Sequence, residues 1–348
     1  MPNNNNKPYR VVQWATGTVG ASAMRGVIGH PDMELVGAYV YSGQKEGRDA
    51  GDLCGLDPVG VRATRNVDEI LALKPDCVLY MPDKGNIDEL CNLLESGANV
   101  STTCLQYYSP ARMDPAMRER IEEACRRGNS TLHASGSSPG FITEALPMVL
   151  LSLQRQLDCI TIDEFADCTG VCSDDMLFNY IGFGETPEVF AKRNLAQRDE
   201  CFEHSLSVLA DAIGKPIERF EASSMFATAR NGLRVGEGFV EAGTVAAQRL
   251  ILTGMHGGKP LVRMRTNWYV TTDVEPDLGL LPTGWRVQVE GDAPLDVKIS
   301  FPVEDADRPL TMPRLTAHRP VNAIPAICSA PAGIFTTIDL PDVVTRLG

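Results

Sequence analysis

A glycine-containing turn near the N-terminus is the feature that most constrains the fold of this chain. An apolar run, VVQWA at residues 11–15, leads into a turn that carries Ala15, Gly17 and Gly20. These residues have the spacing of a G-x-G-x-x-G fingerprint with alanine in the first place, between an expected strand and an expected helix. In that context Gly17 lets the backbone approach a pyrophosphate, and the N-terminus of the helix faces the phosphates with free N–H groups. The turn therefore predicts dinucleotide binding.

The pattern after this turn alternates strands with helices. Expected helices lie at residues 20–29, 67–73, 87–96 and 115–127, and expected strands lie at 35–41, 76–81, 99–103 and 130–134. Strands that alternate with helices form βαβ units, which build a parallel sheet with helices on both faces. We therefore predict an α/β fold with a doubly wound parallel sheet in the first 140 residues.

The second half of the chain has a different pattern. A strand is expected at residues 158–165 and mostly helix at 188–213; strands are then expected at 219–228, 238–253, 261–270, 285–290 and 295–301. Strands without intervening helices indicate a mixed or antiparallel sheet, so this half is expected to be an α+β domain. The Gly/Pro-containing stretch SGSSPG at residues 135–140 marks the boundary.

Composition excludes several classes of protein. The chain has 348 residues, which favours two domains, and its net charge of −13 argues against a nucleic-acid-binding protein. The N-terminal residues are polar and no apolar stretch is long enough to cross a bilayer, so we expect a cytoplasmic protein without membrane contact. The ten cysteines form no CxxC pair. We therefore expect reduced thiols and no metal site.

The expected cofactor site follows from the carboxyl ends of the strands, where ligands bind in open α/β sheets. The strand at 35–41 lacks the terminal carboxylate that would bind a ribose diol, and Ser42, Lys45 and Arg48 follow it. A hydroxyl and two cations suit a 2′-phosphate, so NADP is favoured over NAD, although Asp49 and Asp52 are close enough in sequence to reach a ribose. The predicted cofactor residues are Ala15, Thr16, Gly17, Thr18, Val19, Gly20, Ser42, Lys45, Arg48, Met81, Pro82, Thr102 and Thr103.

Several longer stretches resemble one family of oxidoreductases. They are VVQWATGTVG (11–20), KEGRDAGDLCGL (45–56), KPDCVLYM (74–81), ASGSSPGF (134–141), EAGTVAAQR (241–249) and VNAIPAICSAPAGIFTTIDLP (321–341). The chain resembles the dihydrodipicolinate-reductase-like oxidoreductases, in the branch of 2,4-diaminopentanoate dehydrogenase and the native amine dehydrogenases. The resemblance implies a Rossmann domain at residues 1–140, an α+β substrate and dimerisation domain at 141–315, and a segment at 316–348 that returns to the first domain. It also implies a homodimer and hydride transfer between NAD(P) and a carbonyl or imine carbon.

One position departs from the pattern of that family. Amine dehydrogenases of the branch carry a carboxylate just after the fifth strand, where it handles ammonia, and this chain has Leu105 and Gln106 there. A leucine cannot hold ammonium, so ketone or alcohol chemistry is as open as imine or amine chemistry. We predict that Leu105, Gln106, Asn179 and Tyr180 contact the substrate.

Hydride transfer to a carbonyl or imine also needs a proton donor. Tyr107, Tyr108, His133 and Glu144 are the predicted catalytic residues, with Asp167, Asp174 and Asp175 as further candidates. Each of these side chains also fits a structural role, as a packed tyrosine, a buried histidine or a helix cap.

Two functions remain open at this point. The first is an NAD(P)-dependent dehydrogenase or reductase that acts on a small to medium, largely apolar carbonyl, imine or amine. The alternative is a non-catalytic dinucleotide-binding protein, a redox sensor or regulatory subunit, which the missing carboxylate would explain.

Overall fold

The computed structural model describes residues 7–169, 172–193 and 200–347. The chain divides into two compact units, one formed by Met1–Phe141 with Leu310–Gly348 and the other by Ile142–Pro309. Each unit has its own seven-stranded sheet. Within the described ranges, no helix is both long and apolar enough to cross a membrane.

The first unit contains a parallel sheet with the strand order β16-β6-β5-β4-β1-β2-β3. Its strands are β1 (Tyr9–Trp14), β2 (Met33–Tyr39), β3 (Ala63–Thr64), β4 (Cys77–Tyr80), β5 (Asn99–Thr102), β6 (Thr131–Ala134) and β16 (Gly333–Phe335). Every neighbouring pair is parallel. The order reverses between β1 and β4, so the crevice beyond the carboxyl ends of these two strands is the expected ligand site.

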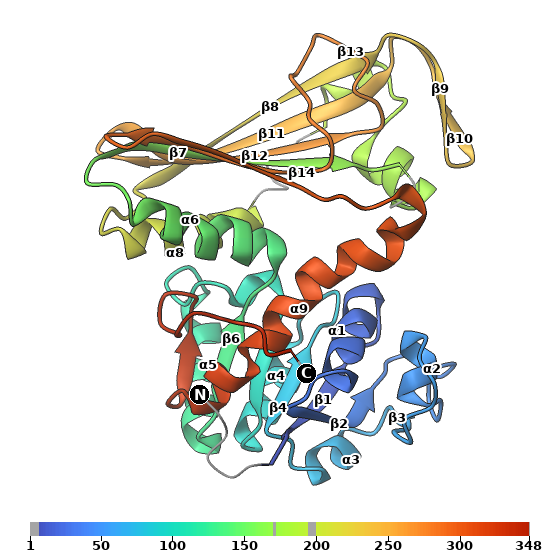
Figure 1. Cartoon of the computed structure of the whole chain (residues 1–348), viewed down its shortest axis with the longest axis vertical. Coiled ribbons are helices and arrows are strands. Elements are labelled where there is room, and N and C mark those ends of the chain that lie inside the picture. The colour runs from blue at the N-terminus through green and yellow to red at the C-terminus, as the bar shows by residue number, and fades with distance from the viewer. Residues whose placement is uncertain (1–6, 170–171, 194–199, 348) are drawn as a thin grey trace. The chain divides into compact units, whose positions relative to one another are not determined.

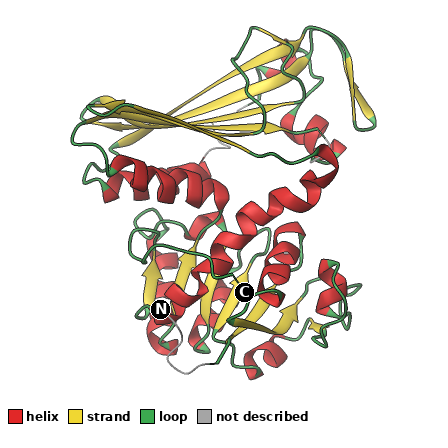
Figure 2. Ribbon diagram, in the orientation of Figure 1, coloured by secondary structure: helices red, strands yellow, loops and turns green. Residues whose placement is uncertain are grey.

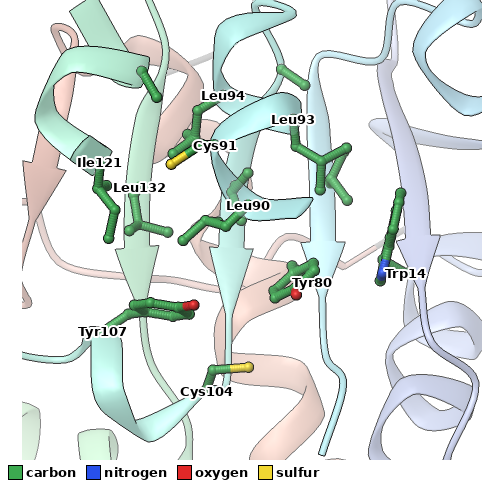
Figure 3. Packing of buried hydrophobic residues seen from close by; sticks show 14 of the residues in the cluster. Trp14, Tyr80, Leu90, Cys91, Leu93, Leu94, Cys104, Tyr107, Ile121 and Leu132 are labelled. Atoms are coloured by element: carbon green, nitrogen blue, oxygen red, sulfur yellow. The ribbon is translucent and has the colours of Figure 1, made fainter. Parts of the chain in front are cut away.

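Helices cover both faces of this sheet (Figure 2). They are α1 (Thr18–Ile28), α2 (Ala50–Cys54), α3 (Val67–Ala72), α4 (Ile87–Glu95), α5 (Pro115–Gly128) and α9 (Arg308–Ser329). Side chains of β4 alternate between the two faces. Val78 and Tyr80 pack with residues of α3, α4 and α5, whereas Cys77 and Leu79 pack with residues of α1, α2 and α9. Figure 3 shows the first of these layers, with Leu90 and Leu94 over the sheet.

The last helix of the first unit brings the C-terminal segment onto the sheet. The described α9 contains Pro313, Pro320 and Pro325, each of which lacks the N–H of a normal helical hydrogen bond. Two serine hydroxyl groups contact carbonyl groups of this helix: Ser101 Oγ donates to Pro320 O over 3.0 Å, which ties α9 to β5, and Ser329 Oγ donates to Pro325 O over 2.9 Å. The strand β16 that follows pairs with β6 and extends the sheet (Figure 1).

The second unit contains a mixed sheet with the order β13-β8-β11-β12-β7-β14-β15, and a separate β9-β10 hairpin. Its strands are β7 (Leu157–Asp167), β8 (Arg219–Ala229), β9 (Leu233–Val235), β10 (Gly238–Val240), β11 (Val245–His256), β12 (Lys259–Tyr269), β13 (Val274–Glu275), β14 (Gly284–Gly291) and β15 (Leu295–Ser300). Its helices are α6 (Leu146–Leu151), α7 (Pro187–Phe190) and α8 (Glu200–Ala212), with irregular helical turns η3 (Asp175–Ile181) and η5 (Asp305–Asp307). A further irregular turn, η2 (Ser137–Ala145), runs along the chain across the boundary of the two units. Only β7 and β12 pair in parallel among the described strands of this sheet.

The predicted α/β class, with a parallel sheet in the first unit and a mixed sheet in the second, is confirmed. One expected strand was wrong. Residues 238–253 form two strands, because a turn at Glu241–Thr244 with Gly243 at φ 82° separates β10 from β11. Within the expected helix at 188–213, residues 194–199 lie outside the described ranges.

Candidate active site

Hydrogen bonds from a buried glutamine side chain hold the turn after β1 in place. Gln13 is fully buried, and its Nε2 donates to Ala15 O over 2.9 Å and to Trp14 O and Leu79 O over 3.3 Å each. Ala15 adopts the left-handed conformation at φ 68°, which is uncommon for a residue with a Cβ. This conformation turns the chain sharply into α1, so that the helix begins at the carboxyl edge of the sheet.

The two glycines of the turn face different surroundings. A Cβ on Gly20 would lie 2.2 Å from Ala15 O and 2.9 Å from Gln13 Nε2, so only glycine allows α1 to approach β1 this closely. A Cβ on Gly17 would have no atom within 4 Å. No side chain caps the N-terminus of α1, and the first residues of this helix line one cavity together with Gly17. An anionic group such as a pyrophosphate fits this position.

A cavity of about 390 Å³ lies at this edge, wholly within the first unit. Its wall comes from the turn, from the loops that follow β4 and β5, from the segment after β6, and from α9. The lining residues are Gly17, Thr18, Val19, Gly20, Met81, Pro82, Asp83, Thr103, Cys104, Leu105, Tyr108, Gly136, Ser138, Pro139 and Thr316. A volume of this size suits part of a cofactor with a small ligand.

The predicted cofactor residues fall into three groups, of which two lie in or beside the cavity. Seven of them line the cavity: Gly17, Thr18, Val19, Gly20, Met81, Pro82 and Thr103. Ala15, Thr16 and Thr102 are buried beside it. Thr102 holds strand ends together, because its Oγ1 donates to Tyr80 O over 2.6 Å and accepts from Cys104 N over 3.0 Å.

Ser42, Lys45 and Arg48 lie on the loop after β2, where the dinucleotide's adenosine end is expected. Lys45 reaches the glycine turn, and its Nζ donates to Thr16 O over 2.7 Å. Arg65, which directly follows β3, adds a cation to this loop: its guanidinium lies 3.8 Å from the Cβ position of Gly43 and 3.9 Å from Glu46. The sequence analysis did not find Arg65, because the two-residue strand before it gives no recognisable pattern.

The predicted residues after β5 lie in different surroundings, and only some of them line the cavity. Leu105 lines the cavity with 39% of its surface exposed, and Tyr108 lines it as a buried residue whose hydroxyl donates to Pro139 O over 3.1 Å. Tyr107 is buried in the apolar layer with Leu90 and Leu132 (Figure 3), and this burial raises the pKa of its hydroxyl. The side chain of Gln106 turns back to the preceding loop, where its Nε2 donates to Gly85 O over 3.3 Å.

His133 lies in β6 and is 1% exposed. Its Nδ1 contacts Phe335 O over 2.9 Å, so the ring links β6 to β16, and its Nε2 has no partner among the described residues. Burial lowers the pKa of the imidazole to about 4. His133 is not among the residues that line the cavity, and its neutral ring has a structural role between two strands.

Glu144, Asn179 and Tyr180 belong to the second unit. Glu144 is 1% exposed and accepts a hydrogen bond from Ser205 Oγ over 2.5 Å. Asn179 Nδ2 donates to Asp175 Oδ1 over 2.8 Å, and Tyr180 is half exposed. None of the three is among the residues that line the cavity of the first unit.

The three aspartates considered as further candidates also have partners in the second unit. Asp167 accepts from Thr169 and pairs with Arg308 at 3.7 Å, Asp174 accepts from the backbone N–H of Glu237, and Asp175 accepts from Asn179. Among the described residues, no group of three or more His, Cys, Asp or Glu gathers as a metal site would require.

Three lining residues with hydroxyl or carboxyl side chains are not among the predicted site residues: Asp83, Ser138 and Thr316. Asp83 follows β4 in a loop that the strand pattern marks as part of the site, so its position was available from the sequence. Thr316 comes from α9, and its Oγ1 contacts Ser137 Oγ over 2.7 Å. No local pattern links residue 316 to the turn after β1.

The family follows from the second unit and the C-terminal segment. Residues 141–347 match the model of the 2,4-diaminopentanoate dehydrogenase C-terminal domain. The chain belongs to this family. The match confirms the resemblance that the sequence motifs indicated.

Relatives extend the similarity to the whole chain. An amine dehydrogenase of Streptomyces virginiae is 28% identical over 97% of this chain and 98% of its own length. A 2,4-diaminopentanoate dehydrogenase of Acetoanaerobium sticklandii is 23% identical over 79% of this chain and 76% of its own length. The structure of an amine dehydrogenase from Mycobacterium smegmatis superposes with a TM-score of 0.78, with 19% identity and 99% of both chains covered. The chain is an NAD(P)-dependent dehydrogenase of this family.

Substitutions at Gly20 and Gly17 test separately the close packing of α1 on β1 and the binding of the cofactor. Gly20→Ala places a methyl group against Ala15 O and is expected to lower the free energy of unfolding by about 1–3 kcal/mol, as overpacking does. Gly17→Ala meets open space at an ordinary φ of −70° and is expected to leave the thermal midpoint unchanged. It is expected to raise the NAD(P)H dissociation constant at least about tenfold, because the methyl group takes the place of a phosphate oxygen. Thermal unfolding and nicotinamide fluorescence measure the two effects, and equal stability of both variants would contradict the packing argument.

The buried histidine predicts a pH dependence of stability. The unfolded chain protonates His133 near pH 6.5, whereas the folded chain resists protonation down to about pH 4. Above pH 7 the group has no effect. As the pH falls from 6.5 towards 4, His133 lowers the free energy of unfolding progressively, by up to ~3 kcal/mol. Urea unfolding at pH 7.5 and 5.0 measures this loss, and the non-titrating variant His133→Gln is expected to lose less stability over the same interval. Parallel losses in the two proteins would refute the assignment, since all other histidines remain in both.

Proposed function

We propose that the chain transfers a hydride between the nicotinamide of NAD(P) and a carbonyl, imine or amine carbon of a small to medium, largely apolar substrate. The cavity at the turn after β1 carries this proposal. One side of it presents the N-terminus of α1 and the open space at Gly17, and the other side is lined by Met81, Pro82 and Leu105. The same cavity thus has a phosphate-binding edge and an apolar wall. The dehydrogenase relatives support the same function, hydride transfer.

The residues present fit a dinucleotide. The N–H groups at the start of α1 would bind the pyrophosphate, and the close approach at Gly20 fixes the direction of that helix. Met81, Pro82 and Thr103 would lie along the nicotinamide end, which supplies or accepts the hydride when bound. Tyr108 is the predicted proton donor that lines the cavity, with its hydroxyl held by Pro139 O. The remaining predicted donors, Tyr107, His133 and Glu144, have the structural contacts described above.

We further propose a preference for NADP over NAD. Asp49, an acid near the end of β2, is already engaged, because it accepts from the N–H groups of Gly51, Val59 and Gly60 over 2.8 Å each. These hydrogen bonds, led by the one from Val59, lower its pKa and keep it charged within its own turn. Lys45 and the predicted Arg48 lie with Ser42 on the loop after β2, and Arg65, which follows β3, reaches the same loop at Gly43. A hydroxyl with these cations matches a 2′-phosphate better than a ribose diol.

Assembly and location complete the proposal. We propose a homodimer, as the family resemblance implies; much of β8 is exposed, including Met225 at 44%, and offers sheet surface for a second copy. We also propose a cytoplasmic location. Nine described cysteines are free thiols, which is typical of a reducing compartment.

Cofactor preference can be tested through Lys45. The variant Lys45→Ala is expected to raise the dissociation constant for NADPH about tenfold or more, which corresponds to about 1.4 kcal/mol, and that for NADH less than about threefold. The ratio is the decisive quantity, because the loss of the Lys45–Thr16 hydrogen bond affects both cofactors. Fluorescence titration measures it, with Lys298→Ala in the second unit as a control lysine. An unchanged NADPH/NADH ratio would contradict the proposed 2′-phosphate site.

The reaction itself can be tested with a panel of ketones, alcohols and amines, with and without ammonia. We expect turnover of at least one largely apolar substrate, followed by nicotinamide fluorescence. The variant Leu105→Glu adds a carboxylate to the cavity wall and is expected to raise ammonia-dependent turnover about tenfold or more. Tight cofactor binding without any turnover in the wild-type chain would overturn the proposed function. Unchanged amination in a well-folded Leu105→Glu variant would show that this position does not handle ammonia.

A further inference from the structure

The charge on the cavity wall is unusual for an enzyme that reduces only carbonyl groups. Asp83 is the one acidic residue in the described lining, and this lining contains no lysine, arginine or histidine. A ketone that accepts a hydride develops negative charge on oxygen, which cations or O–H and N–H donors stabilise. A carboxylate in the same cavity disfavours that charge and favours a cation.

Asp83 is available to a ligand. It is exposed, and it makes no hydrogen bond or ion pair with any residue in the described ranges, although Lys84 is its neighbour in the chain. Its charge acts on the cavity wall. Burial is the main cause that raises the pKa of the Cys104 thiol to about 11, and the negative charge of Asp83 adds to it. Cys104 therefore remains neutral, and Asp83 is the charged group at this end of the cavity.

We propose that Asp83 is a catalytic residue that binds the cationic nitrogen of the substrate, as ammonium, iminium or protonated amine. The inference rests on the proposed function and deepens it. It assigns the nitrogen-binding carboxylate, which amine dehydrogenases of the branch carry just after the fifth strand, to the loop after β4 in this chain. Leu105, on the loop after β5, then forms part of the apolar wall that receives the substrate's carbon chain.

The carboxylate of Asp83 would stabilise both cations of the reaction, first ammonium and then the iminium ion. Asp83 binds ammonium in the cavity. After the ammonium loses a proton to solvent, the ammonia adds to the ketone carbon, a proton moves from nitrogen to oxygen, and a carbinolamine forms. The carbinolamine hydroxyl group takes a proton from solvent and leaves as water, and an iminium ion remains beside the carboxylate of Asp83. Bound NAD(P)H would supply the hydride, with its two electrons, to the iminium carbon and would itself be oxidised. The C=N double bond becomes a single bond and the product is a neutral amine. The reverse sequence oxidises an amine.

The isosteric variant Asp83→Asn tests the role of the charge. We expect kcat/KM for amine oxidation and for ammonia-dependent reduction to fall about 100-fold or more, within the range for removal of one group that stabilises charge on the reacting atoms. Ammonia-independent ketone reduction is expected to change less than about threefold. A readout without turnover is the binding of a primary alkylamine to the enzyme–NADP⁺ complex, followed by calorimetry, which is expected to weaken at least about tenfold.

Two controls separate the local charge from other effects. Glu34→Gln removes one exposed carboxylate at the amino end of β2, far along the strand from the cavity edge, and is expected to leave amine binding and turnover unchanged. The double variant Asp83→Asn with Leu105→Glu returns a carboxylate to the cavity from the opposite loop. We expect it to recover at least about tenfold of the lost amine activity.

The outcomes distinguish this inference from the proposed function. If Asp83→Asn reduces amine and ketone turnover equally, or weakens NADPH binding to the same degree, Asp83 has a structural role and the inference fails while the proposed function stands. Alkylamine binding that is the same in wild type and Asp83→Asn would also overturn it. If the wild-type chain turns over no substrate but binds alkylamine through Asp83, the proposed function fails and the nitrogen site stands.

Discussion

The contact between Gly20 and the carbonyl group of Ala15 sets the geometry of the candidate site. A Cβ at residue 20 would overlap that oxygen, and the same oxygen accepts a hydrogen bond from the buried amide of Gln13. Gln13 also bonds Leu79 O, so one side chain links the ends of β1 and β4 at the point where the strand order reverses. The direction of α1, and with it the phosphate-binding edge of the cavity, depends on this buried polar contact.

A second set of contacts fixes the neighbouring strand ends. Trp14 stacks on Tyr39 with ring centroids 3.8 Å apart, and its Nε1 donates to the hydroxyl of Tyr41 over 3.0 Å. Tyr41 and Tyr80 both donate to Glu89 Oε2, over 2.7 and 2.9 Å. These bonds join β1, β2, β4 and α4 through one carboxylate. The crevice therefore has a rigid floor, and the loops that follow the strands can differ between relatives without a change in the fold.

The local pattern was sufficient to predict the parallel sheet and the turn after β1, because each depends on residues close together in the sequence. It was not sufficient for α9 or β3. Three prolines inside α9 argue against a helix, and tertiary contacts such as Ser101–Pro320 provide partners that the sequence does not reveal. The strand β3 has two residues and no periodicity to detect. Arg65 and Thr316, which depend on these elements, were missed for the same reason.

The predicted proton donors show that the chemical type of a residue does not by itself identify a catalytic group. Tyr107, His133 and Glu144 were predicted because their side chains can transfer protons, but all three are buried. Tyr107 lies in the apolar layer, His133 contacts Phe335 O between two strands, and Glu144 accepts from Ser205 Oγ. A polar group that is satisfied inside a core is held in place by the same bonds that keep it from a substrate. Asp83 has the opposite character, since it is exposed at a strand end without a described partner. In a doubly wound sheet, the position of an ionisable residue directly after a strand is therefore a stronger guide to function than its chemical type, and a net charge of −13 spread over the surface says little about the single carboxylate that faces the cavity.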